Sequence, residues 1–258
     1  MKTFSLVLLA AVLFGPAAAS AASAQLNVLI SDGFSGAYEQ LLPEFETTSG
    51  IKITTGSGAS QGAGLQTIAA QLARGVPADV VILSREGLSE LIDANRIVAG
   101  TDVDLARVPL GVGVRAGSPK PDVSTVEALK KVLLDAKTIA VPESTSGIWL
   151  ATKLFPRLGL AEKINVKATP RGSQATEMVA AGAAEIVVMP VSEIVHARGV
   201  DLAGIIASEI QFVQTFSAAV VAGSGDIESS KRLIDFLASA RAAEAIRKAG
   251  MEPLTTSR

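Results

Sequence analysis

Four short stretches of the sequence combine serine, threonine and glycine directly before a segment whose apolar spacing predicts a helix. The first N–H groups of a helix have no partner within the helix and carry the positive end of its dipole. Hydroxyl groups add donors, and glycine lets an anion approach the backbone. Any one such stretch is an ordinary helix cap, but four that converge would form an anion-binding site made mainly of neutral dipoles. The four stretches are residues 31–33, 56–64, 144–147 and 171–173.

Charged residues in or near these stretches have two interpretations each. Arg171 stands at a predicted helix start, where a cation repels the helix dipole, so it is either a partner for an anionic ligand or a solvated surface arginine. Arg85, after the apolar run at 80–83, has the same two interpretations. Asp32 is either an N-cap or a carboxylate that acts inside a cleft.

Composition excludes several other kinds of site. The 258 residues contain no cysteine and one histidine, His196, so thiol chemistry, disulfides and cysteine-based or histidine-rich metal sites are excluded. The 23 Lys+Arg residues are matched by 25 Asp+Glu, which leaves no excess cation to neutralise nucleic-acid phosphates. We therefore expect no metal, no cofactor and no nucleic acid to be bound.

The first 24 residues have the pattern of a secretory signal peptide. Lys2 precedes an apolar run from Phe4 to Phe14, and residues 22–24 have the small-x-small form that signal peptidase accepts. The run is shorter than the roughly 20 residues that a membrane span needs. We therefore expect cleavage after Ala24, and a soluble monomer in the periplasm.

The rest of the chain alternates apolar runs with helical patterns, which is typical of an α/β fold with mostly parallel sheets. A continuous apolar run such as residues 80–83 predicts a strand covered on both faces. Strands are expected at 27–30, 51–54, 80–83, 110–114, 138–141, 186–189 and 217–221, and helices at 38–48, 65–73, 125–134, 148–158, 173–181, 229–239 and 241–249.

Two similar strands predict that the chain crosses between two lobes. The strands at 110–114 and 217–221 are each followed within three residues by Gly-Ser. If both are crossings, near residues 109–112 and 214–217, one lobe is 25–109 plus 217–258 and the other is 110–216. A ligand would then bind in the cleft between the lobes, at the carboxyl ends of the strands.

The segment from Gly75 to Val81 carries a resemblance to a known family. It is similar to the Gly-x-Pro-Ala-Asp motif and apolar strand of the molybdate/tungstate-binding family, which belongs to the type II periplasmic substrate-binding proteins. The end of the chain, from Ala243 to Gly250, is also similar to that family. The resemblance implies a two-lobed α/β fold with a ligand cleft between the lobes. It also implies capture of a small anion, a molybdate-like oxyanion or a polycarboxylate, for an ABC permease.

The same resemblance implies which residues bind the anion. The family uses a serine after the first strand, which Ser31 matches, and another in the next turn, which is Ser57 or Ser60 here. It also uses backbone donors at later helix starts. Where the family commonly has a tyrosine, this sequence has none and offers Met189, which suits a larger, partly apolar anion. The full expected ligand set is Ser31, Ser57, Ser60, Ser146, Gly147, Arg171, Gly172, Ser173 and Met189.

A second function fits the same scaffold, because the chain also resembles secreted aconitate isomerases. These enzymes interconvert cis- and trans-aconitate by an allylic proton shift, which needs donors for three carboxylates and one base. Arg171, with Arg85, would clamp carboxylates of the substrate. Asp32 is the first candidate for the base, because cleft closure could desolvate it and raise its pKa. The further candidates, in order, are Glu143, Glu193 and His196.

Overall fold

A continuous path of paired strands runs through the whole molecule in the computed structural model, which describes residues 25–254. The predicted signal peptide and its cleavage after Ala24 lie outside these residues. The strands are β1 (Gln25–Ile30), β2 (Lys52–Ser57), β3 (Val80–Ser84), β4 (Val103–Arg115), β5 (Ile139–Pro142), β6 (Val166–Thr169), β7 (Ile186–Pro190), β8 (Val200–Ile205), β9 (Val213–Val220) and β10 (Glu252–Pro253).

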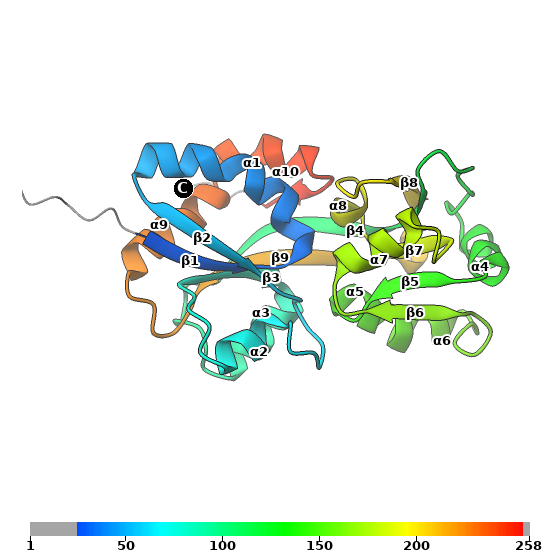
Figure 1. Ribbon diagram of the computed structural model, residues 1–258, viewed down its shortest axis with the longest axis horizontal. Coiled ribbons are helices and arrows are strands. Elements are labelled where there is room, and N and C mark those ends of the chain that lie inside the picture. Colours follow the sequence, from blue (N-terminus) through cyan, green and yellow to red (C-terminus); the bar gives the residue numbers. More distant parts are fainter. Residues whose placement is uncertain (1–24, 255–258) are drawn as a thin grey trace, which may run out of the picture.

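The strand order is β2-β1-β3-β9-β4-β7-β5-β6, and β8 and β10 also pair with β4. The pairs of β1 with β2 and β3, and of β5 with β6 and β7, are parallel. Every pair that involves β4 or β9 is antiparallel. The expectation of mostly parallel sheets therefore holds for the outer strands of each half and not for the two long strands in the middle (Figure 1).

Helices flank the sheet in both halves of the molecule (Figure 1). Within residues 25–254 no helix is both long and apolar enough to cross a membrane. The helices are α1 (Asp32–Ser49), α2 (Ile68–Ala73), α3 (Arg85–Asp93), α4 (Val126–Asp135), α5 (Thr145–Trp149), the π-helical η1 (Leu150–Leu154), α6 (Phe155–Arg157), α7 (Gly172–Ala180), α8 (Val191–Ile194), the 3₁₀ turn η2 (Ser208–Ile210), α9 (Ile227–Leu237), the 3₁₀ turn η3 (Ala240–Ala242) and α10 (Ala243–Lys248).

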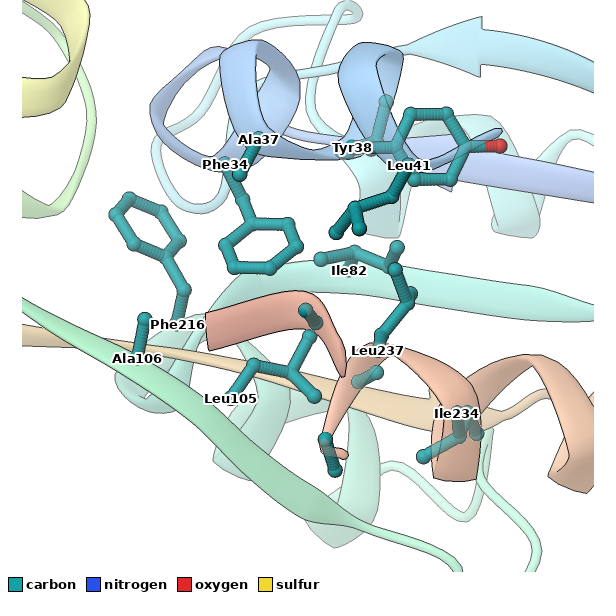
Figure 2. Packing of buried hydrophobic residues seen from close by; sticks show 14 of the residues in the cluster. Phe34, Ala37, Tyr38, Leu41, Ile82, Leu105, Ala106, Phe216, Ile234 and Leu237 are labelled. Atoms are coloured by element: carbon teal, nitrogen blue, oxygen red, sulfur yellow. The ribbon is translucent and has the colours of Figure 1, made fainter. Parts of the chain in front are cut away.

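The continuous apolar run of β3 reflects burial of both faces of the sheet, as its sequence predicts. Val80 and Ile82 pack against α1, α9 and α10, whereas Val81 and Leu83 pack against α2 and α3. Successive side chains of a strand point to opposite faces, so a strand with helices on both sides needs apolar residues throughout. Figure 2 shows the first of these clusters, in which Phe34 of α1 lies beside Ile82 and Phe216.

Strand β4 changes its partners along its length, and this change divides the sheet into two halves. Residues 103–109 of β4 pair with β9, and residues 110–114 pair with β7. The chain returns between η2, which packs in the second half, and Val213, which pairs with Pro109. These pairings support the expected first crossing near 109–112 and favour a return slightly before the expected 214–217. The division of the chain into one lobe of residues 25–109 plus 217–258 and another lobe of residues 110–216 stays a prediction.

Gln211 links the two segments that pass between the halves. Its side-chain oxygen accepts from the Leu110 N–H at 2.8 Å, and its side-chain NH₂ donates to the Leu110 carbonyl at 3.1 Å. Next to it, Phe212 stacks on Trp149 with ring centroids 5.2 Å apart. This contact packs Trp149 against the core of the second half.

Helix α1 begins six residues earlier than the sequence predicts, because its first turns contain glycines that weaken the helical pattern. Gly33 and Gly36 allow close packing across the molecule. A side chain at Gly33 would collide with the ring of Phe216, and one at Gly36 would collide with His196. Helix α3 and strands β6 and β8 are present in addition to the predicted elements.

Asp79, the acidic residue of the Gly-x-Pro-Ala-Asp motif, holds two distant segments together. Its carboxylate accepts from the Asn27 N–H at 2.8 Å and from the Ser224 hydroxyl at 2.8 Å. The N–H of Gly225 lies 3.3 Å from the same carboxylate. The motif therefore ties β1 to the connection between β9 and α9, and its role is in the fold.

We predict that Asp79→Ala lowers the free energy of unfolding by about 3 kcal/mol or more, because it leaves several partly buried donors without a charged acceptor. Urea denaturation followed by circular dichroism measures this change. Asp93→Ala, at the exposed end of α3, is the matched control and should change stability by less than about 0.5 kcal/mol. Equal stability of Asp79→Ala and the wild-type chain would contradict this role.

Candidate functional site

The N-terminal ends of α1, α5 and α7 meet the loop after β2 at one cavity between the two halves of the molecule. We call this the inner cavity. Its volume is about 20 Å³, enough for one water but not for a polycarboxylate, so the cleft is closed. It is lined by Ser31, Asp32, Gly33, Gly58, Ala59, Ser60, Pro142, Ser144, Ser146, Arg171, Gly172, Glu193, Gln214 and Phe216.

An ion pair between Asp32 and Arg171 closes the cleft. Asp32 is the first residue of α1 in one half, and Arg171 directly precedes α7 in the other. One carboxylate oxygen accepts from Arg171 Nε at 3.1 Å, and the other pairs with Arg171 Nη2. The backbone N–H of Ser173 donates to the same carboxylate at 3.3 Å, and Arg171 Nη1 donates to Ser57 Oγ at 3.1 Å. Two-pronged pairing of this kind fixes the relative position of the halves.

Two hydroxyl contacts join the halves on the other side of the cavity. The hydroxyl groups of Ser84 and Thr145 lie 2.7 Å apart, and the Gln61 N–H donates to Ser144 Oγ at 3.4 Å. Gly62 lies so close to the carbonyl of Glu143 that any side chain there would collide with it. Ligand entry therefore requires these contacts and the Asp32–Arg171 pair to separate.

Several buried polar groups face the inner cavity with unused hydrogen-bonding capacity. Ser31 Oγ and Gln214 Oε1 are buried and have no partner among residues 25–254. Ser60 Oγ accepts from the Ser84 N–H at 3.0 Å, which leaves its own hydrogen free to donate. Ser146 is 3% exposed and lies in the first turn of α5, where backbone N–H groups have no helical partner. Buried polar atoms without partners point to a polar ligand.

Glu193 lies in α8, the short helix after β7, and its pKa is shifted strongly by its surroundings in the closed cleft. Burial and, to a smaller extent, the charge of Asp32 raise its pKa to about 8, while Arg171 partly opposes the shift. Its carboxyl group lies against the backbone of Gly172, where any side chain would collide with it. A pKa of about 8 favours the protonated form of Glu193 at pH 7.

A second polar cavity lies on the other side of Asp32 and Glu193, and we call it the outer cavity. Its volume is about 170 Å³. Ser192 Oγ is buried there without a partner in the described part of the chain. The lining residues are Asp32, Ser35, Ser173, Thr176, Ser192, Glu193, His196 and Ala197.

The structure brings together six of the ten residues expected to form the site. The other four lie next to the inner cavity without lining it. Ser57 accepts a hydrogen bond from Arg171, which lines the cavity. Ser173 lies at the outer cavity, and Met189 is buried beneath Gly172. Gly147 packs against the carbonyl of Pro142. The ligand contacts of all ten stay predictions; the six that line the cavity are Ser31, Asp32, Ser60, Ser146, Arg171 and Gly172.

The remaining candidates from the sequence lie elsewhere. Arg85 pairs with Asp102 at 2.8 Å and with Asp104, so its guanidinium is already neutralised outside the inner cavity. Glu143 is exposed, and His196 is exposed at the outer cavity. The described residues contain no group of three or more histidine, aspartate or glutamate side chains that could hold a metal ion.

Sequence reasoning missed Gln214 and Phe216, which line the inner cavity from β9. The strand was expected to begin at Ser217, because Gln214 interrupts the apolar run. In the sequence, Gln214 has apolar residues close by on both sides, and this pattern was the signal that could have extended the predicted strand.

Comparisons with known proteins agree with this architecture. A sequence profile described as bacterial extracellular solute-binding protein matches residues 26–252. A protein named aconitate isomerase, from a Pseudomonas species, is 34% identical over 230 residues, which cover 89% of this chain and 88% of that protein.

Solved structures show the same two-lobed fold at lower identity. A periplasmic molybdate-binding protein from Azotobacter vinelandii is 21% identical, with a TM-score of 0.67 over 88% of this chain and 98% of its own. A sulfate-binding protein from Mycobacterium tuberculosis is 20% identical, with a TM-score of 0.71 over 90% and 87%. The substrate-binding domain of a molybdenum ABC transporter protein from Clostridium difficile is 22% identical, with a TM-score of 0.64 over 89% and 99%. These structures establish the fold.

We predict that the Glu193 side chain titrates with a midpoint near pH 8. Carbon-13 NMR of protein labelled at the glutamate carboxyl carbon measures this midpoint, and Glu193→Gln identifies the resonance by removing it. Because the folded chain binds this proton more tightly than an unfolded chain does, the stabilisation is complete below about pH 4.5 and is lost as the pH rises through 8. Titration at about 4.5 would show that the carboxyl group is not desolvated.

Proposed function

This chain belongs to the family of bacterial extracellular solute-binding proteins, and we propose that its cleft captures a small anion, with a polycarboxylate as the favoured class. The observation that carries this proposal is the convergence of three helix N-termini and Arg171 on one cavity. Backbone N–H groups, hydroxyl groups and a guanidinium together are a set of donors suited to carboxylate oxygens.

The carboxylate of Asp32 in the inner cavity favours a polycarboxylate over a metal oxyanion. A small tetrahedral oxyanion that binds Arg171 would keep all of its charge beside Asp32, which Arg171 also holds. A polycarboxylate spreads its charge over several groups, so that one can pair with Arg171 while another receives the hydroxyl and backbone donors. The absence of the tyrosine that molybdate-binding relatives commonly have supports the same choice.

Delivery to an ABC permease is the proposed use of the captured anion. Solute-binding proteins of this family pass their ligands to such transporters, and cleft closure produces the surface that a permease can distinguish from the open form. A periplasmic location, with removal of residues 1–24, and a monomeric state belong to the same proposal.

We predict that Ser31→Ala and Ser146→Ala each weaken anion binding by about 1.5–3 kcal/mol, the usual contribution of a hydrogen bond to a charged group. Isothermal titration calorimetry with citrate, trans-aconitate, sulfate and molybdate measures the affinities. Ser89→Ala, on the exposed face of α3, is the control and should bind like the wild-type chain. Binding of an uncharged solute instead, with no heat from any of the four anions, would overturn the proposal.

Aconitate isomerisation is the second candidate function. It is favoured by the 34% identical relative and by the presence of a carboxyl group in the cavity whose pKa lies near neutral pH. A base that must both remove and return a proton works best with such a pKa. Closure pairs both oxygens of Asp32 with Arg171, whereas the Glu193 carboxyl group lines the cavity without an ion-pair partner in the described part of the chain. A pKa of about 8 leaves an ionised fraction of Glu193 at neutral pH that can remove a proton, so the geometry favours Glu193 over Asp32 as the base.

We predict that, if the protein is an isomerase, it converts cis-aconitate in deuterated water to trans-aconitate with deuterium at one carbon. Proton NMR measures this incorporation, and Glu193→Gln should lower kcat by about 100-fold or more. Glu177→Gln, exposed on α7, is the matched control. Full activity of Glu193→Gln with loss of activity in Asp32→Asn would assign the base to Asp32. No conversion above a buffer blank would rule out the isomerase and leave anion binding as the proposed function.

A further inference from the structure

We infer that the inner cavity binds an anion with Glu193 in its protonated form, so that above neutral pH, where the ligand-free group begins to ionise, capture of an anion by this chain takes up a proton. The inference rests on the proposed function and extends it. It follows from where the carboxyl group lies, from the charges that surround it, and from its contact with the outer cavity.

Glu193 and Asp32 together form the wall between the inner and outer cavities. The Glu193 carboxyl group is pressed against the backbone of Gly172, and Met189 packs under the same glycine. In the closed cleft the carboxyl group therefore lies between α7 and the inner cavity. An anion that enters the inner cavity must therefore lie near it.

The charges around Glu193 decide which of its two forms can accept an anion. The facing groups are Asp32 on α1, Arg171 before α7, and His196 after α8. Asp32 and Arg171 neutralise each other through their two-pronged pair, and His196 is exposed at the outer cavity. An ionised Glu193 would give the inner cavity one net negative charge, because Asp32 and Arg171 together contribute none. A protonated Glu193 leaves it neutral and adds an O–H donor to the serine hydroxyls and backbone N–H groups.

The outer cavity gives Glu193 a source of protons while the cleft is closed. Its volume of about 170 Å³ accommodates several waters, whereas the inner cavity accommodates about one. Hydroxyl groups line it, and Ser192 Oγ is buried there without a partner in the described chain, which is the environment that holds ordered water. Glu193 can therefore exchange a proton with solvent on the side away from the ligand.

The coupling predicts a specific pH dependence. A bound anion favours the protonated form, so the pKa of Glu193 is higher in the complex than its value of about 8 in the ligand-free chain. Affinity should be constant below about pH 8. Between that pH and the higher pKa of the complex, each unit of pH should weaken binding by about tenfold, because one proton must be taken up for each anion bound.

Isothermal titration calorimetry with citrate between pH 7 and 9.5, in two buffers of different ionisation enthalpy, measures both the affinity and the number of protons taken up. We expect uptake to rise toward one proton above pH 8 in the wild-type chain and in the control Glu177→Gln. We expect Glu193→Gln to bind citrate with a pH-independent affinity and no uptake, because an amide keeps the shape and the donor but does not titrate.

The outcomes separate this inference from the proposed function. Binding of citrate to the wild-type chain with no proton uptake, or with the same uptake in Glu193→Gln, would overturn the inference and leave anion capture standing. Failure of citrate, trans-aconitate, sulfate and molybdate to bind either chain at pH 7 would overturn both.

Discussion

The ion pair between Asp32 and Arg171 determines the geometry and the charge of everything around the cleft. It joins the first residue of α1 to the residue before α7, so it holds the helix starts of the two halves against each other. It also cancels the only two charges that the inner cavity would otherwise present at neutral pH. What remains is a set of neutral donors and one protonated carboxyl group, and this set is suited to an anion.

The donors that this ion pair holds in place explain why one fold can serve both anion capture and proton transfer. A binding site for a polycarboxylate needs oriented donors in a place that excludes water, and so does an allylic proton shift. The difference between the two functions lies in a group that exchanges a proton within reach of the ligand. Glu193 has that position, since burial and the neighbouring Asp32 raise its pKa while Gly172 leaves room for its carboxyl group against the cavity.

The motif that carries the family resemblance has a structural role and does not touch the ligand site. Asp79 binds backbone and hydroxyl groups of two segments that are more than a hundred residues apart, and it lies at the end of β3 remote from the cavity. Gln211 performs a similar function where the halves join, by binding both backbone groups of Leu110. Asp79 joins distant segments within the first half, Gln211 joins the segments that pass between the halves, and neither residue lines the inner cavity.

The alternation of strands and helices and the donor-rich helix starts can be read from the sequence alone, because they depend on local periodicity and on residue types; the two lobes follow from the two similar strands and the family resemblance. Ser31, Ser60, Ser146 and Arg171 could be found in this way. The fold was needed to show that Asp32 is paired with Arg171, that Arg85 is neutralised outside the inner cavity, and that Glu193 and Gln214 line it. Those facts depend on contacts between segments far apart in the chain, and a carboxyl group's charge state depends on the burial and the neighbours that only such contacts create.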